Sequence, residues 1–293
     1  MGKKKAEVLG IVAGLCATAA AAIYFRGQNN DIMITELTCR CPKLPEAFEG
    51  YNIAHVSDLH GKMFGQNQKD LISLIKKQKP DMIAVTGDVV DRMHTNIGAV
   101  TAFVRQAVKI APVYYVPGNH EADFWQYPRL LTLLREAGVA VLDNKKEVIC
   151  RGDAAIEIVG VADPLFYTRR RNNVTQAYYM RKNIRQALDD DTVADGNVRI
   201  LLSHRPEHID VYKRYNIDLV LAGHAHGGQW RIPGVGGLFA PDQGIMPTFT
   251  SGMHTVGDTA LVISRGLGNS AFPLRIANRV ELVAVTLTNV QQA

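Results

Sequence analysis

The chain is poor in cysteine, with four in 293 residues, and the two nearest each other stand as Cys39-Arg40-Cys41. This spacing differs from the CxxC of zinc and redox sites, so we expect free thiols or small buried apolar residues. Three catalytic signatures are also missing: the GxxxxGK[ST] phosphate loop, the GxSxG nucleophile elbow and the HExxH zinc motif. Their absence argues against P-loop nucleotide hydrolases, α/β-hydrolases and HExxH metalloproteases.

An excess of charge of one sign is missing as well. The 33 basic and 28 acidic residues leave a net charge of +5, and 47% of the residues are apolar. These values exclude disordered, collagen-like and coiled-coil classes. Such a mild charge does not indicate a nucleic-acid binder and suits an anionic substrate or a membrane surface equally well. Without an internal repeat or a long Ser/Pro linker, the length predicts one large domain after an N-terminal segment.

The N-terminal segment has the pattern of a secretory signal or a membrane anchor. Three lysines at residues 3–5 precede an uncharged run over residues 8–25, which a basic and polar stretch follows. The run is just long enough to span a bilayer, which needs about 20 residues. We expect residues 1–30 to be an uncleaved anchor, because its aromatic end suits a membrane interface, with a cleaved signal as the alternative. The lysines then predict an extracytoplasmic domain over residues 31–293.

Short apolar runs alternate with helical patterns along this domain. The alternation predicts an α/β domain of two packed sheets with outer helices, its first half mostly parallel. We predict helices over residues 66–78, 96–108 and 125–137, and strands over 51–57, 81–86, 112–116, 139–142, 147–150, 155–161, 198–202, 218–221, 254–256, 260–264 and 280–287.

Five clusters of polar residues follow predicted strands, four of them directly. Ligands of parallel α/β sheets bind at the carboxyl ends of the strands, so we expect these distant segments to converge. Five of the nine histidines belong to them, which makes chance scatter a poor explanation. In chain order the clusters are Asp58-Leu59-His60, Gly87-Asp88-Val89-Val90-Asp91, Gly118-Asn119-His120-Glu121, Ser203-His204 and Gly223-His224-Ala225-His226.

The clusters offer carboxylate, imidazole and amide donors but no thiolate. This set suits divalent ions such as Mn, Fe or Zn and excludes Cu(I) and iron–sulfur clusters. Two i, i+2 pairs, Asp58 with His60 and His224 with His226, would each point to one face in extended chain. A glycine precedes three of the clusters' polar residues, where it permits a sharp turn and leaves room for metal and substrate.

The five clusters match, in order, the DxH, GDxxD, GNH[ED], lone His and GHxH motifs, and on them the sequence resembles the calcineurin-like metallophosphoesterases over about residues 50–287. It is most similar to a membrane-associated bacterial phosphodiesterase branch, on GHAHGGQWRIP (Gly223–Pro233) and on SRGLG (Ser264–Gly268) followed by PLR. Ala225 departs from the more usual Thr at a position that is not a ligand. The resemblance implies a four-layer αββα sandwich with two mixed β-sheets, preceded by the N-terminal hydrophobic helix.

The resemblance also implies a role for each matching residue. Two divalent ions, Mn first with Fe or Zn as alternatives, would hold a hydroxide between them that attacks phosphorus. His120 would donate a proton to the leaving oxygen or stabilise its charge, and Asp91 would orient His120. The implied ligands are Asp58, His60 and His226 for one ion, Asn119, His204 and His224 for the other, and Asp88 for both.

These roles predict a hydrolase for the phosphodiester or pyrophosphate bond of a phosphorylated small molecule. The anchor favours a lipid-linked or nucleotide substrate, since relatives in this branch include enzymes that cleave UDP-diacylglucosamine. That substrate would require a cytoplasmic active site, opposite to the predicted topology. Two alternatives stay open, a non-catalytic metal-binding scaffold of the same fold and a nuclease. Nucleic acid is not the expected partner, because a concentrated basic groove is missing.

Weaker patterns lie outside the clusters. A basic and aromatic stretch over residues 166–182 is compatible with contact to anionic lipid or a substrate phosphate, and equally with a solvated face. Three aromatic residues after the third cluster could line a groove, although helix packing is favoured. They are Phe124, Trp125 and Tyr127. Among the remaining histidines we expect His55 in the core and His94, His208 and His254 at the surface or in loops.

Overall fold

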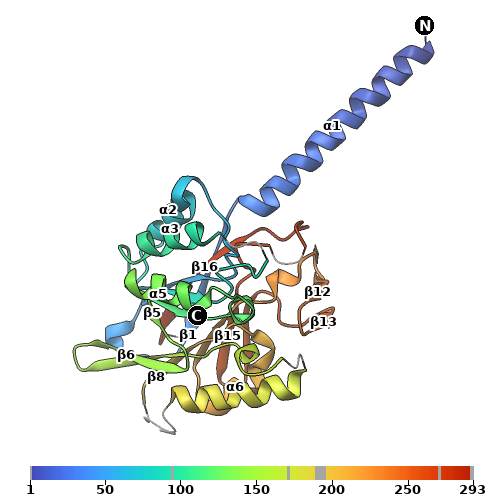
Figure 1. Cartoon of the computed structure of the whole chain (residues 1–293). Helices are drawn as coiled ribbons and strands as arrows, with labels where there is room; N and C mark the ends of the chain where they lie inside the picture. The colour runs from blue at the N-terminus through green and yellow to red at the C-terminus, as the bar shows by residue number, and fades with distance from the viewer. Residues whose placement is uncertain (1, 94–95, 170–171, 189–195, 270–271, 291–293) are drawn as a thin grey trace.

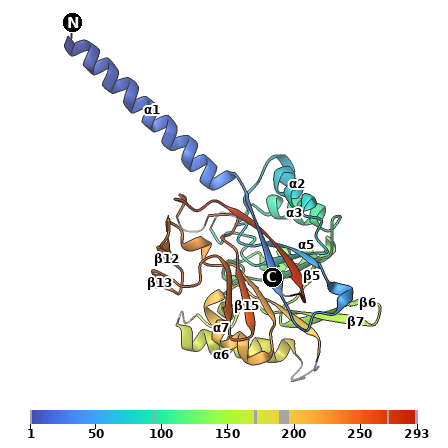
Figure 2. The ribbon, with the colours of Figure 1, turned by 180° about the vertical axis from the view of Figure 1, so that it is seen from behind.

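The computed structural model describes residues 2–93, 96–169, 172–188, 196–269 and 272–290, with side chains from residue 9 onward. His94 and two arginines of the basic stretch, Arg170 and Arg171, lie outside the described residues. Helix α1 (Gly2–Asn30) stands away from an α/β domain (Figures 1 and 2). Its segment Leu9–Asn30 has the length and composition to cross a membrane and is not buried against the domain.

The first sheet has six strands, and its neighbours run parallel except β16 and β2. Apolar, β-branched runs with little charge form its central strands, as expected for strands covered on both faces. In spatial order its strands are β1 (Met33–Arg40), β16 (Glu281–Thr288), β2 (Asn52–Val56), β3 (Met82–Thr86), β4 (Val113–Val116) and β5 (Ala140–Val141).

The second sheet also has six strands, and only its two edge strands are antiparallel to their neighbours. Two short ribbons project from the loops after it, β10 (Arg231–Ile232) with β11 (Gly236–Gly237) and β12 (Phe239–Ala240) with β13 (Gly244–Ile245). In spatial order the sheet contains β14 (Gly252–Val256), β15 (Thr259–Ile263), β9 (Leu219–Ala222), β8 (Val198–Leu202), β7 (Ala154–Gly160) and β6 (Lys145–Arg151).

The two sheets pack face to face between two layers of helices. Alternation along β8 shows the layering, because Ile200 packs between the sheets while Leu201 packs against the outer helices. This arrangement confirms the predicted four-layer αββα sandwich with two mixed sheets. Helices α2 (Lys69–Lys77), α3 (Ile97–Ala107) and α5 (Tyr127–Glu136) cover the first sheet, and α6 (Asn173–Ala187) and α7 (Ile209–Tyr212) cover the second.

Three features differ from the sequence prediction. Strand β1 was not predicted, because its sequence MITELTCR mixes charged and apolar residues as an edge strand does; it pairs in parallel with β16, more than 240 residues away. The helix predicted from residue 66 begins at Lys69, because Asn67 and Gln68 have φ of 53° and 64°. The basic stretch folds largely as α6, at the end of the domain opposite α1 (Figure 1).

The predictions for isolated aromatic residues and histidines are confirmed at some positions and not at others. Phe124 lies in the core and His55 is fully buried against Thr86, both as expected. Trp125, by contrast, is 82% exposed, so the aromatic run is not packed as a unit. His208 lies in the turn after β8, as the loop alternative expected, but only 4% of it is exposed, so it is not a surface residue.

Candidate metal centre

The five polar clusters occupy the loops that follow β2, β3, β4, β8 and β9. The first three strands are neighbours in one sheet, the last two are neighbours in the other, and β3 contacts both β8 and β9. The carboxyl ends of the central strands of both sheets therefore meet at one edge of the sandwich. All seven side chains that the sequence predicted as ligands are there, each at most 7% exposed.

One group of donors comes from the first and last clusters. Ligand atoms of Asp58, His60 and His226 all lie within 4.8 Å of one another. His226 Nε2 is 3.3 Å from Asp58 Oδ1 and 3.3 Å from His60 Nε2. Three buried electron-pair donors thus face a common point.

The other group lies around Asp88. Its carboxylate joins His204 and His224 in a set within 4.8 Å, and His204 Nε2 is 3.1 Å from both Asp88 Oδ2 and Asn119 Oδ1. The opposite nitrogen, His204 Nδ1, donates to the carbonyl of Thr86 at 2.7 Å. A neutral His204 therefore presents a lone pair at Nε2, as a metal-binding histidine does.

The pKa shifts in both groups indicate that a positive charge between the donors would be stabilised. Burial lowers the pKa of His60 to about 4, and burial together with His60 lowers the pKa of His226 well below its usual range. Two uncharged imidazoles therefore face the Asp58 carboxylate, and neither ring supplies a positive charge to offset it. Burial also opposes charge on His204, but Asp88 outweighs it and raises the pKa of His204 to about 10. Divalent cations would meet both demands, so this nitrogen and oxygen donor set fits them.

Five of the seven side chains stand on left-handed backbone. Their φ angles lie between 47° and 65°, where residues other than glycine cost about 1–3 kcal/mol each. The extended geometry predicted for the i, i+2 pairs is therefore wrong; Asp58 and His60 still face one point, whereas His224 and His226 face different donor groups. The chain must turn sharply where each strand ends, and a left-handed residue turns its side chain back over the sheet edge. The five are Asp58, His60, Asp88, His224 and His226.

Comparison of the sequence with known proteins agrees with this geometry. The family model of the calcineurin-like phosphoesterases matches residues 51–228. The chain is 31% identical over 239 residues to YkoQ of Bacillus subtilis, an uncharacterized metallophosphoesterase, with 79% of this chain and 81% of that protein covered. The chain belongs to the calcineurin-like phosphoesterase family. This metallophosphoesterase is accordingly a metal-dependent phosphoester hydrolase, as the motifs predicted.

Other relatives are named more specifically. The chain is 29% identical over 242 residues to phosphodiesterase YaeI of Escherichia coli, covering 81% of this chain and 82% of that protein. It is 26% identical over 292 residues to a transmembrane protein with a metallophosphoesterase domain from Danio rerio, covering 94% of this chain and 62% of that protein. Among solved structures, the fold is similar to Thermus thermophilus sulfate thiohydrolase SoxB, with a TM-score of 0.51, 16% identity, and 84% of this chain and 58% of that chain covered.

Close backbone approach explains the glycines that precede the donors. A Cβ on Gly223 would lie 1.9 Å from Ser57 Oγ and 2.3 Å from Asp58 Oδ2, and one on Gly118 would lie 2.3 Å from Asp88 Oδ1. Glycine therefore leaves room here for the side chains of Ser57, Asp58 and Asp88, and the room predicted for metal and substrate stays a prediction. The sharp turn holds only for Gly87, which has a φ of 85°.

We expect Gly223→Ala to destabilise the fold by about 1–3 kcal/mol, because the added methyl group overpacks the first loop. It should also weaken metal binding, since Asp58 must move aside. Thermal unfolding with and without metal measures both effects. Gly14→Ala is the matched control, because a Cβ there meets nothing within 4 Å. Unchanged unfolding and metal binding in Gly223→Ala would contradict the close approach.

Glu121 fastens the second loop to the third in this metallophosphoesterase. Its carboxylate accepts backbone N–H bonds from Gly118 at 2.6 Å, Asp88 at 2.8 Å and Val90 at 3.2 Å. Burial, followed by the charge of Asp88, raises the pKa of Glu121 to about 8. The motif position was visible in the sequence, but its role as a clamp needed the fold.

The SRGLG and PLR segments support the first loop from behind. Leu267 N donates to Ser57 O at 3.1 Å and Gly268 N to Asp58 O at 2.5 Å. Arg275 is fully buried, and its guanidinium donates to the carbonyls of Gly268 at 2.6 Å and Arg265 at 2.8 Å. In the sequence these residues supported the family resemblance but had no assigned role. The structure shows that they hold the loop bearing Asp58 in place.

Asp242 is a site residue that sequence reasoning missed. Its Oδ2 lies 3.2 Å from His224 Nε2 and accepts a 2.6 Å bond from Arg205 Nη1. Arg205 is itself buried and paired with Asp163 at 2.5 Å. Asp242 therefore sits where a carboxylate orients a metal-binding histidine. It stands outside every motif, so only the fold brings it to His224.

We expect Asp242→Asn to weaken metal binding by about 10–100-fold, the usual effect of losing such a carboxylate partner. The asparagine keeps the size of the side chain but removes the charge that holds His224. Metal titration followed by calorimetry measures the change. Asp258→Asn, in the exposed turn between β14 and β15, is the control. Equal affinity in the two variants would show that Asp242 does not position His224.

His120 and Asp91 lie beside the donors. His120 Nε2 is 3.9 Å from Asp88 Oδ2, and in the neutral ring Nδ1 accepts a 3.3 Å bond from Arg92 N. Asp91 Oδ2 is 3.4 Å from His120 Nδ1 and 3.7 Å from His60 Nδ1. Asp91 thus faces a histidine of the donor set as well as His120, a second contact that the sequence did not indicate.

Proposed function

We propose that this protein is a dinuclear phosphodiesterase whose ions are held by the seven clustered donors. The observation that carries the proposal is their convergence: six buried donors from four loops form two groups, each within 4.8 Å, and Asn119 Oδ1 of the fifth loop lies 3.1 Å from His204 Nε2 in the second group. A cation pair supplies charge stabilisation at phosphorus and lowers the pKa of water to near 7. The proposed ligands are Asp58, His60 and His226 for one ion, Asn119, His204 and His224 for the other, with Asp88 shared.

The chain's own contribution to the reaction is proton transfer at His120. A water that has lost one proton to solvent bonds through its oxygen to phosphorus, the bond from phosphorus to the leaving oxygen breaks, and the electron pair departs on that oxygen. The cationic ring of His120, protonated on both nitrogens, presents Nε2 next to the donor groups, so it is placed to donate that proton to the leaving oxygen and to return to the neutral imidazole. Asp91 acts as a positioning residue, because its carboxylate lies 3.4 Å from Nδ1 and attracts the proton on that nitrogen of the cationic ring.

A diester or pyrophosphate substrate is favoured by two observations. The Escherichia coli relative is named a phosphodiesterase, and the chain carries a helix long and apolar enough to anchor it in a membrane. The anchor also supports a lipid-linked substrate over a free nucleotide. Residues 1–30 then form the anchor and residues 31–293 the catalytic domain.

A direct assay tests the proposal. The full-length protein in detergent is stripped with EDTA, reloaded with Mn, Fe or Zn, and given bis(p-nitrophenyl) phosphate. We expect two ions per chain and hydrolysis that EDTA abolishes, with Mn the most effective ion. Fewer than two ions after each loading, or no hydrolysis with any of the three, would refute the dinuclear phosphodiesterase.

We also propose that the catalytic domain is extracytoplasmic, and an exposed cysteine on β6, Cys150, permits a test. A membrane-impermeant maleimide should label Cys150 in intact cells, and a Cys150→Ser variant should lose that label. Labelling only after lysis would place the domain in the cytoplasm. That outcome would reverse the topology and make UDP-diacylglucosamine the first substrate to assay.

A further inference from the structure

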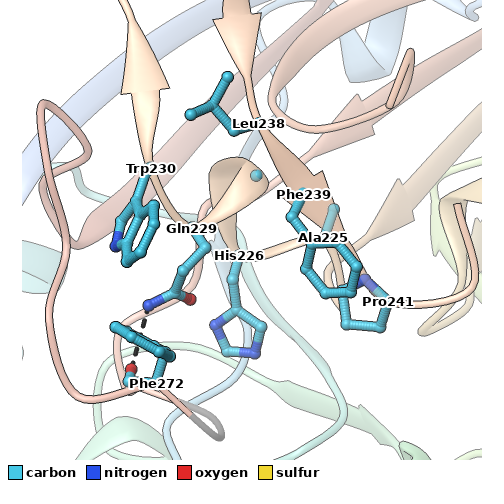
Figure 3. Close-up of a pocket in the computed structure, with 9 residues that line it drawn as sticks. Ala225, His226, Gln229, Trp230, Leu238, Phe239, Pro241 and Phe272 are labelled. Carbon is cyan, nitrogen blue, oxygen red and sulfur yellow. Dashed lines mark hydrogen bonds between the residues drawn. The ribbon is translucent and has the colours of Figure 1, made fainter. Parts of the chain in front are cut away.

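An apolar pocket of about 260 Å³ opens beside the donor groups (Figure 3). It lies between the loop that carries the GHxH motif, the ribbon β12–β13 and the segment that begins at residue 272. Most of its walls are aromatic or aliphatic side chains. It is lined by Ala225, His226, Gly228, Gln229, Trp230, Leu238, Phe239, Pro241 and Phe272.

His226 belongs to both the pocket and the first donor group. Its ring forms part of the pocket wall, while its Nε2 atom lies 3.3 Å from Asp58 Oδ1. A phosphate bound at the donors therefore lies at the inner end of this pocket. One substituent on that phosphate would extend along the apolar wall.

The side-chain N–H groups of Gln229 and Trp230 in the wall already have hydrogen-bond acceptors. Gln229 Nε2 donates to the carbonyls of Phe272 and Leu274, both at 3.0 Å, and Trp230 Nε1 donates to Leu274 at 3.1 Å. A nucleobase or sugar placed here would bury donors and acceptors against hydrocarbon, which costs free energy for each unpaired group. A hydrocarbon chain carries no such cost, so the pocket discriminates in its favour.

The same bonds build the pocket before any substrate arrives. They tie the GHxH loop to residues 272–274, and the rings of Trp230 and Phe272 pack edge to face with centroids 5.0 Å apart. Asn278 adds two more ties, donating to the carbonyls of His226 at 2.7 Å and Gln229 at 3.0 Å. A wall fixed in this way binds a chain without an ordering cost.

The pocket also lies toward the membrane helix. Past Phe272, the same segment meets the end of α1, where Ala277 N donates to Tyr24 Oη at 2.8 Å and Asn278 N to Gln28 Oε1 at 2.7 Å. Strands β12 and β13 lie in the half of the domain from which α1 emerges, opposite α6 (Figures 1 and 2). Phe239 and Phe272 are 54% and 48% exposed at this rim, an apolar edge near the bilayer surface.

We propose that this pocket binds the hydrocarbon chain of a lipid phosphoester whose phosphate lies at the donor groups, an inference that rests on the proposed function. The chain is recognised by apolar contact with Phe239, Phe272 and Leu238. The phosphate end is recognised by the cations. The protein therefore selects substrates by the length of an alkyl or acyl chain.

A series of alkyl p-nitrophenyl phosphates tests the selection, with methyl, butyl, hexyl and octyl esters below their critical micelle concentrations. On the Mn-loaded full-length protein, we expect kcat/KM to rise about fourfold per added methylene until the pocket is filled. Phe239→Ser and Phe272→Ser should each flatten this rise. Both side chains are half exposed, so neither variant should fail to fold. Val148→Ser on the exposed face of β6 is the matched control and should keep the full slope.

The possible outcomes separate the two proposals. Hydrolysis of all esters at one rate would overturn the pocket inference and leave the phosphodiesterase standing. An unchanged slope in both variants would place the chain-binding surface elsewhere and overturn it as well. If no ester is hydrolysed, the proposed function fails, and calorimetry with octyl phosphate against methyl phosphate still tests the pocket: equal affinity would refute it, and tighter octyl binding that both variants lose would support it.

Discussion

Asp88→Asn is expected to abolish hydrolysis, lowering kcat/KM by about 10³-fold or more. Asp88 is 1% exposed, and Oδ2 lies 3.1 Å from His204 Nε2 and 3.9 Å from His120 Nε2. Opposing burial, His204 and His120 hold the pKa of Asp88 well below its usual range, so it is an anion. It is the carboxylate that we propose both cations share, and asparagine keeps its shape but removes the charge.

Rate and metal content must be measured together on this variant. We expect fewer than two ions per chain by elemental analysis, and a loss of rate that added Mn does not restore. Asp258→Asn, an exposed carboxylate with the same change of charge, should retain both ions and the full rate. Loss of metal without loss of rate in Asp88→Asn would defeat the proposed mechanism, because hydrolysis would then not depend on the shared carboxylate.

With an unactivated alkyl ester as substrate, His120→Ala is expected to lower kcat by about 10²–10⁴-fold while both ions stay bound. The side chain is not in the proposed ligand set, and its contact with Asp88 Oδ1 is made by the backbone N–H at 2.8 Å, which alanine keeps. The loss should therefore come from the missing proton donor and not from a damaged metal site. This separation of metal binding from catalysis distinguishes His120 from Asp88.

The leaving group provides the sharper readout. p-Nitrophenolate leaves without protonation, so His120→Ala should cost little with a p-nitrophenyl ester and much more with an unactivated alkyl ester. His254→Ala, a histidine on β14 outside the donor groups, is the control. An equal loss with both leaving groups, or a loss of bound metal, would show that His120 supports the site structurally and does not donate the proton.

The sequence by itself predicted most of the strands, the layered fold and the five clusters that the fold brings together. Apolar runs such as MIAVT and VRILL predicted buried strands, and a cluster such as GDVVD directly after one was expected at a sheet edge. Both signals are local: a few neighbouring residues contain them. The ordered set of five clusters then indicated the family without knowledge of any contact.

The tertiary structure alone decided how those residues are held. The left-handed backbone at Asp58 and His226 could not be read from local pattern, because Asp and His tolerate it better than most residues but adopt it only occasionally. Asp242 reaches His224 across 18 residues, and Arg275 donates to the carbonyl of Gly268, contacts that the local sequence does not reveal.

The same limit applies to the pairing of β1 with β16 and to the apolar pocket beside His226. Each depends on which distant segments lie side by side. That choice is made by burial of the whole chain and is not encoded in any single stretch of it.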